Sequence, residues 1–203
     1  VDRAGDALKH GNAYGSSPHG GVLVVAGDDH GCVSSSMPHQ SDQLFQAFHM
    51  PIVAPANVAE HLEFGLYGWA LSRFSGHWVG LTSLSEVVES GATVDLDAIH
   101  ARVAAWKSAD DVGAATGFMP PAQGLHYRWP DLPSLQIEER LAHKLRAVAA
   151  FSAVNSIDRQ VIESPLATVG IVTCGKAHYD LMEMLPRLDI SPHMLADEGL
   201  RLY

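Results

Sequence analysis

The stretch Gly20-Gly21-Val22-Leu23-Val24-Val25-Ala26-Gly27-Asp28-Asp29-His30 sets the expected architecture. Its centre, residues 21–26, is a short apolar run that is rich in β-branched residues and bounded by glycine. Such a run is typical of a strand buried on both faces, as in a parallel sheet. Polar residues follow it directly, and open α/β sheets bind ligands beyond the carboxyl ends of their strands. The stretch therefore predicts a buried strand that ends in a polar loop.

Helix-like and strand-like segments alternate after this run. Residues 41–49 are expected to form a short helix, residues 52–54 a second strand, residues 57–75 a long helix and residues 77–84 a third strand. Strands that alternate with helices pair in parallel. The prediction is an α/β fold with a parallel sheet flanked by helices.

The helix over residues 57–75 is the clearest one. Asn57 can cap it, and Glu60 follows three residues later, as in a capping box. Apolar residues occupy two sides, so we expect burial on both, between the sheet and another domain or subunit. One side carries Val58, Leu62, Leu66 and Trp69, and the other carries Phe64, Tyr67, Leu71 and Phe74. Gly65 and Gly68 would each weaken it by about 1 kcal/mol unless they allow a close backbone approach.

The chain divides into three parts by composition. Residues 1–90 form the first α/β unit, residues 91–165 a proline-interrupted connector, and residues 166–203 the start of a second α/β unit. The connector is expected to hold at most a short helix over 96–106, and then one long helix over 135–155 that Ser134 caps. In the second unit an apolar strand over 168–173 precedes a helix over 176–188, and residues 199–203 begin to resemble a strand.

The composition limits the class of protein. The chain has 203 residues, of which 47% are hydrophobic and 18% charged, so it can build a packed core. Its formal net charge is −10 without a lysine or arginine cluster, which argues against nucleic-acid and anionic membrane partners. No apolar run approaches the roughly 18–20 residues that span a bilayer. Because only two cysteines are present and no disulfide framework is possible, we expect a reducing cytoplasm.

The polar loop provides the candidate site residues Asp28, Asp29, His30, Ser34 and Ser35. The two carboxylates and the imidazole could hold a cation or move a proton. Alternatively, the aspartates cap the following turn and His30 is a solvated loop residue. The hydroxyls and backbone N–H groups of residues 34–36 could bind a phosphate or carboxylate, or could be an ordinary polar loop.

Other reactive side chains give weaker signals. The spacing of His19 and His30 matches no zinc-ligand pattern, so no metal site is expected there. Cys32 lacks a Cys–His pairing signature and is expected to be a buried, inert thiol. Cys174 ends the predicted apolar strand and is expected to pack in a core. The chain carries neither a dinucleotide fingerprint, nor a phosphate-binding P-loop, nor a nucleophile elbow, nor the Gly-Asp-Gly…Asn pattern that holds magnesium diphosphate in thiamine enzymes.

Several ordered blocks from Val1 to Tyr203 resemble one family. The blocks are Val1-Asp2-Arg3-Ala4-Gly5-Asp6, Ser17-Pro18-His19-Gly20-Gly21-Val22, Gly27-Asp28-Asp29-His30, Ser34-Ser35, His39-Gln40-Ser41, Gly65-Leu66-Tyr67-Gly68-Trp69-Ala70-Leu71-Ser72-Arg73 and Gly170-Ile171-Val172-Thr173-Cys174-Gly175-Lys176. The family is indolepyruvate ferredoxin oxidoreductase in its fused bacterial form, within the thiamine-dependent 2-oxoacid:ferredoxin oxidoreductases. The resemblance implies that residues 1–90 are the later part of a pyrimidine-binding domain. It also implies that residues 166–203 start a transketolase C-terminal-like domain.

The resemblance also implies an activity. The family decarboxylates an aryl 2-oxoacid oxidatively to an acyl-CoA and passes electrons to ferredoxin, using thiamine diphosphate, magnesium and [4Fe-4S] clusters. In related enzymes an arginine near the position of Arg3 faces the substrate carboxylate, so Arg3 is the candidate catalytic residue. The glutamate that activates the cofactor and the magnesium motif are missing, so the 203-residue chain is expected to be inactive alone and to need other domains or subunits.

Two alternatives stay open at this stage. The chain could be a non-catalytic α/β interaction module that docks a partner through the helix over 57–75, or it could belong to an enzyme for a different 2-oxoacid. Val1 stands where a methionine would begin a complete protein, and the strand-like residues 199–203 are the last ones. We therefore expect a piece of a longer protein.

Overall fold

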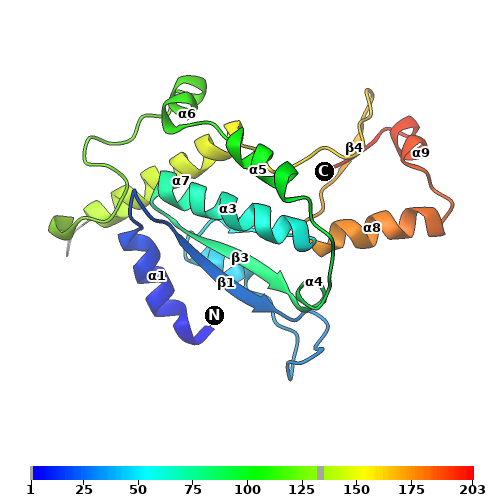
Figure 1. The fold of residues 1–203 in the computed structure, drawn as a ribbon, viewed down its shortest axis with the longest axis horizontal. Helices are drawn as coiled ribbons and strands as arrows, with labels where there is room; N and C mark the ends of the chain where they lie inside the picture. The colour runs from blue at the N-terminus through cyan, green and yellow to red at the C-terminus, as the bar shows by residue number, and fades with distance from the viewer. Residues whose placement is uncertain (1, 132–134) are drawn as a thin grey trace.

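A three-stranded parallel sheet organises the first part of the chain (Figure 1). The computed structural model describes residues 2–131 and 135–203. The strands β1 (Val22–Asp28), β2 (Ile52–Val53) and β3 (Trp78–Leu84) lie in the order β1-β3-β2. β1 and β3 are paired in parallel along their whole length, from Val22 opposite Trp78 to Asp28 opposite Leu84. The predicted α/β fold with a parallel sheet is confirmed.

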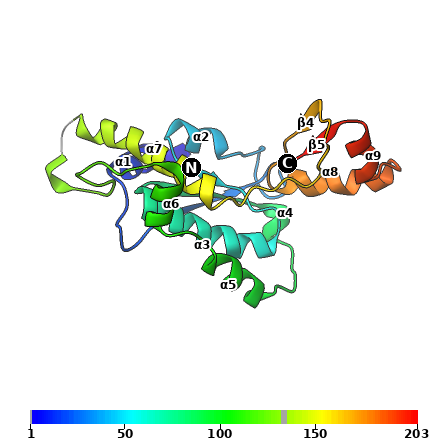
Figure 2. The ribbon, with the colours of Figure 1, turned by 90° about the horizontal axis from the view of Figure 1, so that it is seen from above.

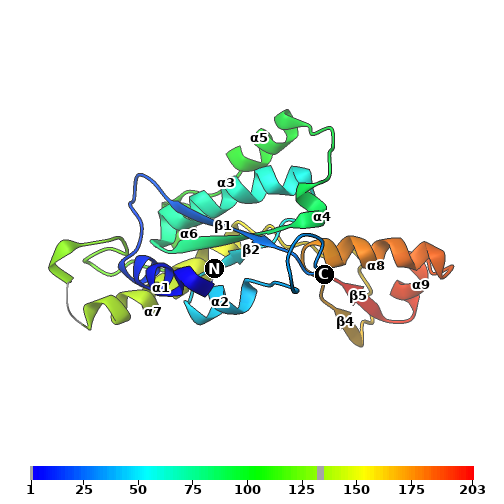
Figure 3. The ribbon, with the colours of Figure 1, turned by 90° about the horizontal axis from the view of Figure 1, so that it is seen from below.

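Helices cover both faces of this sheet. Seen from below in Figure 3, α3 and α5 lie over one face while α1 and α2 lie under the other. The helices and 3-10 turns of the described residues are η1 (Asp2–Ala4), α1 (Gly5–Tyr14), α2 (Asp42–Ala47), α3 (Val58–Ser75), α4 (Ser85–Val88), α5 (Leu96–Ala104), α6 (Ala109–Thr116), η2 (Trp129–Asp131), α7 (Gln136–Val154), α8 (Lys176–Arg187) and α9 (Pro192–Asp197).

The strand β1 is not buried on both faces as predicted. It is an edge strand, so one of its sides has no neighbour, and Val25 on it is 62% exposed. The central strand β3 is the one that is buried on both faces, because it lies between β1 and β2 and has helices on both faces. On the α2 face, Gly80 gives the room for Phe45, since a Cβ at Gly80 would come within 2.8 Å of that ring.

The helix α3 has one buried side rather than two. Phe64, Tyr67 and Leu71 lie in the main core, and the lack of a Cβ at Gly68 leaves room for the side chain of Leu23. The opposite stripe of Leu62, Leu66 and Trp69 is exposed, and open space surrounds Gly65. The predicted burial of this side against another domain or subunit therefore stays a prediction.

The start of α3 differs from the predicted capping box. Asn57 caps the helix as predicted, accepting a hydrogen bond from the backbone N–H of Glu60 at 2.9 Å. The Glu60 carboxylate, however, accepts from the N–H of Ala56 rather than from that of Asn57. The cap is therefore one residue wider than a capping box.

The connector contains more helix than the sequence indicated. The predicted helix at 96–106 is present as α5, and a further helix, α6, follows it with a reciprocal capping box between Ser108 and Asp111. The expected cap of α7 by Ser134 lies outside the described residues. Ala150 and Phe151 of α7 pack in the same core as Val79 of β3, so this segment helps to build the first unit.

Residues 166–203 form a second, smaller α/β unit beside the first (Figure 2). The strands β4 (Val169–Ile171) and β5 (Leu200–Leu202) pair in parallel, and α8 and α9 lie between them in sequence. The predicted helix over 176–188 and the strand over 199–203 are confirmed. The strand over 168–173 is shorter than predicted and largely exposed, since only one side of it has a core, made by Ile162, Leu185 and Leu202.

The second unit contacts the carboxyl edge of the first sheet. The Asn57 side chain at the start of α3 donates to the hydroxyl oxygen of Tyr179 at 2.8 Å. Gly175, which precedes α8, lies against Ala54 in the loop after β2. The second unit therefore sits near the strand ends where ligand sites form in α/β folds.

The core of the first unit includes a buried group of bases. His77 Nδ1 lies 2.9 Å from Asn12 Oδ1, and Lys144 Nζ donates to the carbonyls of Asn12 and Ala13 at 3.1 Å. Both carbonyls belong to the last turn of α1, where acceptors are otherwise unpaired and the helix dipole favours a cation. Burial lowers the pKa of Lys144 to about 7 and that of His77 to about 3. This group joins α7 to α1 and to the start of β3.

In residues 2–131 and 135–203, no helix has both the length and the apolar character needed to span a bilayer.

Candidate functional site

The polar loop after β1 is folded around the Asp29 carboxylate. A pair of backbone hydrogen bonds between Asp29 and His39 closes the loop at its base. Inside it, Asp29 accepts hydrogen bonds from the backbone N–H groups of Val33, Ser34 and Ser35, each at 2.8 Å. These three donors stabilise the charged form and hold the pKa of Asp29 at about 2. Asp29 therefore caps the turn, which is one of the two interpretations that the sequence left open.

This arrangement argues against the phosphate or carboxylate site, one of the two interpretations of residues 34–36 that the sequence left open. The backbone N–H groups that could have bound an external anion already point at Asp29. An anion brought to the same place would also meet the charge of that carboxylate. The loop thus supplies its own anion, and the backbone of Ser34 and Ser35 is not free for another.

Asp28 is buried where β1 ends, and two residues of the following segment hold it. Ser41 donates to it twice, from its backbone N–H at 3.0 Å and from its hydroxyl at 2.6 Å. His39 Nδ1 lies 3.3 Å from the same carboxylate. Ser41 precedes α2 but makes no side-chain cap for it, although serine is a favoured capping residue. Its hydroxyl orients Asp28 instead.

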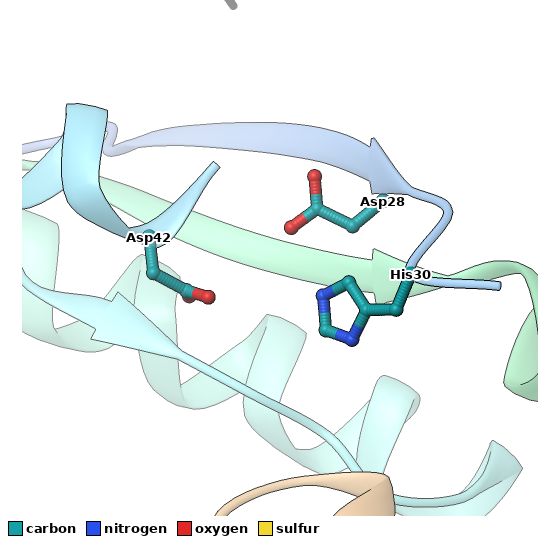
Figure 4. Close-up of side chains that lie close together, drawn as sticks. All are labelled: Asp28, His30 and Asp42. Carbon is teal, nitrogen blue, oxygen red and sulfur yellow. The ribbon is translucent and has the colours of Figure 1, made fainter. Parts of the chain in front are cut away.

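His30 and Asp42 approach Asp28 from two other segments, as Figure 4 shows. One ligand atom from each of these three side chains lies within 4.8 Å of the others. Asp42 is the first residue of α2, and His30 follows β1 in the loop. The fold therefore brings together two carboxylates and an imidazole, a set of groups that can hold a cation or exchange a proton.

A second polar pair lies on the opposite face of the same sheet edge. His61 Nε2 of α3 is 2.9 Å from Ser83 Oγ near the end of β3, and His61 Nδ1 is 3.3 Å from the carbonyl of Asn57. Ser83 is opposite Gly27 in the β1–β3 register. Both faces of the carboxyl edge thus carry a histidine.

Arg3, the candidate catalytic residue, lies in the turn η1 before α1 and is exposed. Within the described parts of the chain it makes no hydrogen bond or ion pair, with the Asp28–Ser35 loop or elsewhere. Hydrogen bonds join Asp29 to Ser34 and Ser35, and Asp28 is held by Ser41 and His39, whereas Arg3 makes none of these bonds.

Neither cysteine lies where the sequence placed it. Cys32 was expected to be buried but is exposed, because it occupies the tip of the loop with a left-handed φ of 55°. Cys174 was expected to pack in a core but is exposed as well, since β4 ends before it. Although Cys174 is exposed as a residue, surrounding atoms desolvate its thiol, and this desolvation, together with the nearby charges of Asp42 and Asp158, raises the pKa of that thiol.

Sequence reasoning missed Asp42, His61 and Ser83 as members of this edge. Asp42 stands at the start of a predicted helix, and Ser83 near the end of a predicted strand, so the rule that strand ends meet at one edge could have found both. His61 carries no such signal, because only the packing of α3 on β3 brings it to Ser83.

Comparisons with known proteins add no assignment. The family models, the curated proteins and the solved structures that were searched contain no match to this chain.

Proposed function

We propose that the chain is part of a thiamine-diphosphate-dependent oxidoreductase that decarboxylates an aryl 2-oxoacid such as indolepyruvate to an acyl-CoA, with ferredoxin as acceptor, in the cytoplasm. The observation that carries the proposal is the ordered series of sequence blocks, above all residues 17–30, 65–73 and 170–176. A parallel α/β sheet with a polar loop at its carboxyl edge agrees with a pyrimidine-domain-like role, and many other functions share that architecture.

The chain's surface supports a role within a larger assembly. Leu62, Leu66 and Trp69 form an exposed apolar stripe on α3, and the Trp69 indole donates to the carbonyl of Gly21 just before the edge strand β1. Val25 of β1 is exposed as well. An apolar stripe beside an open strand edge is a favourable contact for a further element of the same enzyme.

The described residues do not by themselves fit thiamine diphosphate. The loop at the sheet edge carries Asp28, Asp29 and Asp42, which repel a diphosphate, and the backbone N–H groups of residues 33–35 are used by Asp29. The sequence also lacks the Gly-Asp-Gly…Asn pattern for magnesium diphosphate. In the proposed enzyme this chain provides walls of a shared site, while other domains hold the cofactor, the magnesium and the [4Fe-4S] clusters.

The test is an anaerobic assay of the complete polypeptide that contains this chain. The measurement is reduction of a dye acceptor with coenzyme A, thiamine diphosphate, Mg²⁺ and a panel of 2-oxoacids. We expect indolepyruvate to be the best substrate and Arg3→Ala to raise its KM, whereas Arg187→Ala, which also removes an exposed arginine, leaves KM unchanged. No turnover of any 2-oxoacid would refute the proposal, and a preference for pyruvate or 2-oxoglutarate would refute its aryl specificity.

A second candidate function is a non-catalytic interaction module that docks a partner through α3. The exposed stripe of Leu62, Leu66 and Trp69 favours it. The 2-oxoacid assay combined with light scattering of the chain mixed with its partner separates the two functions. An interaction module forms a complex that Leu66→Glu disrupts but shows no 2-oxoacid turnover; a complex that Leu66→Glu leaves intact would show that the stripe is not the docking face.

A further inference from the structure

We propose that Asp28, His30 and Asp42 bind one divalent transition-metal cation, Zn²⁺ or Mn²⁺, at the carboxyl edge of the first sheet. The site is separate from the magnesium diphosphate of the proposed enzyme, because its three ligands are all present in this chain. Figure 4 shows the three side chains converging from the end of β1, the loop after it and the start of α2.

The distances fit a single ion. Ligand atoms about 2.0–2.2 Å from a tetrahedral cation lie about 3.3–3.6 Å apart. The three ligand atoms here are within 4.8 Å of one another, so the side chains would have to close on the ion by at most about 1.5 Å. His30 is exposed and Asp42 is half-buried, so both side chains have room for such a shift.

One of the three candidate ligands is held in place by hydrogen bonds, and the other two are not. Ser41 and His39 orient Asp28, in the way that residues around a metal site orient its ligands. By contrast, His30 and Asp42 make no side-chain hydrogen bond or ion pair with any described residue, so a cation would compete with no existing partner. The Ser41 hydroxyl donates its hydrogen bond to Asp28 and does not cap α2, so it is placed to orient Asp28 as a ligand.

The charge at Asp28 is the strongest reason to expect a cation. This carboxylate is buried at 2% exposure, and burial of a charge is costly unless it is paired. In the described residues no lysine or arginine pairs with it, and the imidazole of His39 is its one ion-pair partner. A divalent cation between Asp28 and the second carboxylate, Asp42, would balance both.

The donor set selects the class of cation. Two carboxylate oxygens and one imidazole nitrogen suit Zn²⁺ or Mn²⁺ better than Ca²⁺ or Mg²⁺, which prefer oxygen donors alone. Three protein ligands leave at least one coordination position open for water or a small molecule.

The test is isothermal titration of the EDTA-stripped 203-residue chain with ZnCl₂, and with MnCl₂ followed by electron paramagnetic resonance. We expect one tight site per chain. His30→Gln and Asp42→Asn should each weaken binding by about 100-fold or more, since loss of an outer partner alone costs about 10–100-fold. Ser41→Ala, which removes such an outer partner, should weaken it by about tenfold.

The matched controls are His193→Gln and Asp197→Asn. These residues form an exposed histidine–aspartate pair at 2.8 Å on α9, and no third His, Cys, Asp or Glu of residues 2–131 and 135–203 completes a metal site with them, so their loss should leave the tight site unchanged. Circular dichroism confirms that each variant is folded. The proposal is overturned if the wild-type chain binds neither cation, or if the His30 and Asp42 variants bind as tightly as the wild type. Neither result depends on turnover of a 2-oxoacid.

Discussion

The two α/β units of this chain both contain a short apolar run that forms a strand, but they reach different degrees of burial. In the first, the central strand β3 buries Val79 completely in the core that it shares with α3. In the second, β4 leaves Val169 half exposed, at 51%, because a single two-stranded sheet packs against α8 on one side. An apolar run indicates a strand, but the number of layers around it determines whether that strand is buried.

The same contrast appears within the first sheet. β1 is as apolar as β3, yet its edge position leaves Val25 in solvent. The predictions below test whether the first unit behaves as one cooperative core and the second as a smaller, separable one.

The largest effect is expected from Phe45→Ala. Phe45 is fully buried and packs against Gly80 of the central strand, so its loss leaves a cavity that the sheet cannot close. We expect a loss of about 3–5 kcal/mol in the free energy of unfolding. Urea denaturation followed by tryptophan fluorescence measures it, because all four tryptophans precede residue 130. A loss below about 1 kcal/mol would contradict the central place of this contact.

A comparable cavity in the second unit should act locally. Leu202→Ala removes a buried side chain of its small core and should cost that unit about 2–5 kcal/mol. Amide hydrogens of β4 and β5 should then exchange faster, while the tryptophan transition of the first unit stays in place. If both units lose stability together, the second one is not separable.

Acid should destabilise the first unit through His77. Burial lowers the pKa of His77 to about 3, against an ordinary value of 6.5, with Lys144 and His49 adding repulsion. Between these two pH values the unfolded chain binds a proton that the folded chain does not, so stability falls as the pH drops below about 6.5. The slope should reach about 1.4 kcal/mol per pH unit. Unfolding of His77→Gln at pH 7 and pH 5 provides the control, since its slope should be smaller.

The smallest effect is expected on the surface of α8. Lys176 and Asp180 form an exposed ion pair one helical turn apart. Asp180→Asn should cost about 0.3–0.5 kcal/mol and lose that effect in high salt. Thermal unfolding at low and high ionic strength checks this; an effect above about 1 kcal/mol would show that α8 depends on its surface charges.

The sequence was sufficient for the elements that local patterns control. The strands β1 and β3, the Asn57 cap of α3 and the helix α8 follow from apolar runs and capping residues within a few positions. The helix α6 was not predicted, because prolines and paired aspartates indicated a loop, although Ser108 and Asp111 form its capping box.

For the site, the sequence identified the loop but not its internal roles. Asp28 and Asp29 are adjacent and chemically identical, yet one accepts from three backbone N–H groups and the other is buried beside Ser41. Their roles differ because β1 ends between them and successive side chains point to opposite faces of a strand. The difference therefore depends on where β1 ends.

By itself, the sequence determined the α/β class, the parallel pairing and the polar edge, because hydrophobic spacing and glycine positions act over short distances. Tertiary structure alone determined that β1 lies at an edge, that one side of α3 is exposed and that Asp42 meets Asp28 and His30. These features depend on which neighbours are present in space, and no local pattern encodes a neighbour that lies far along the chain.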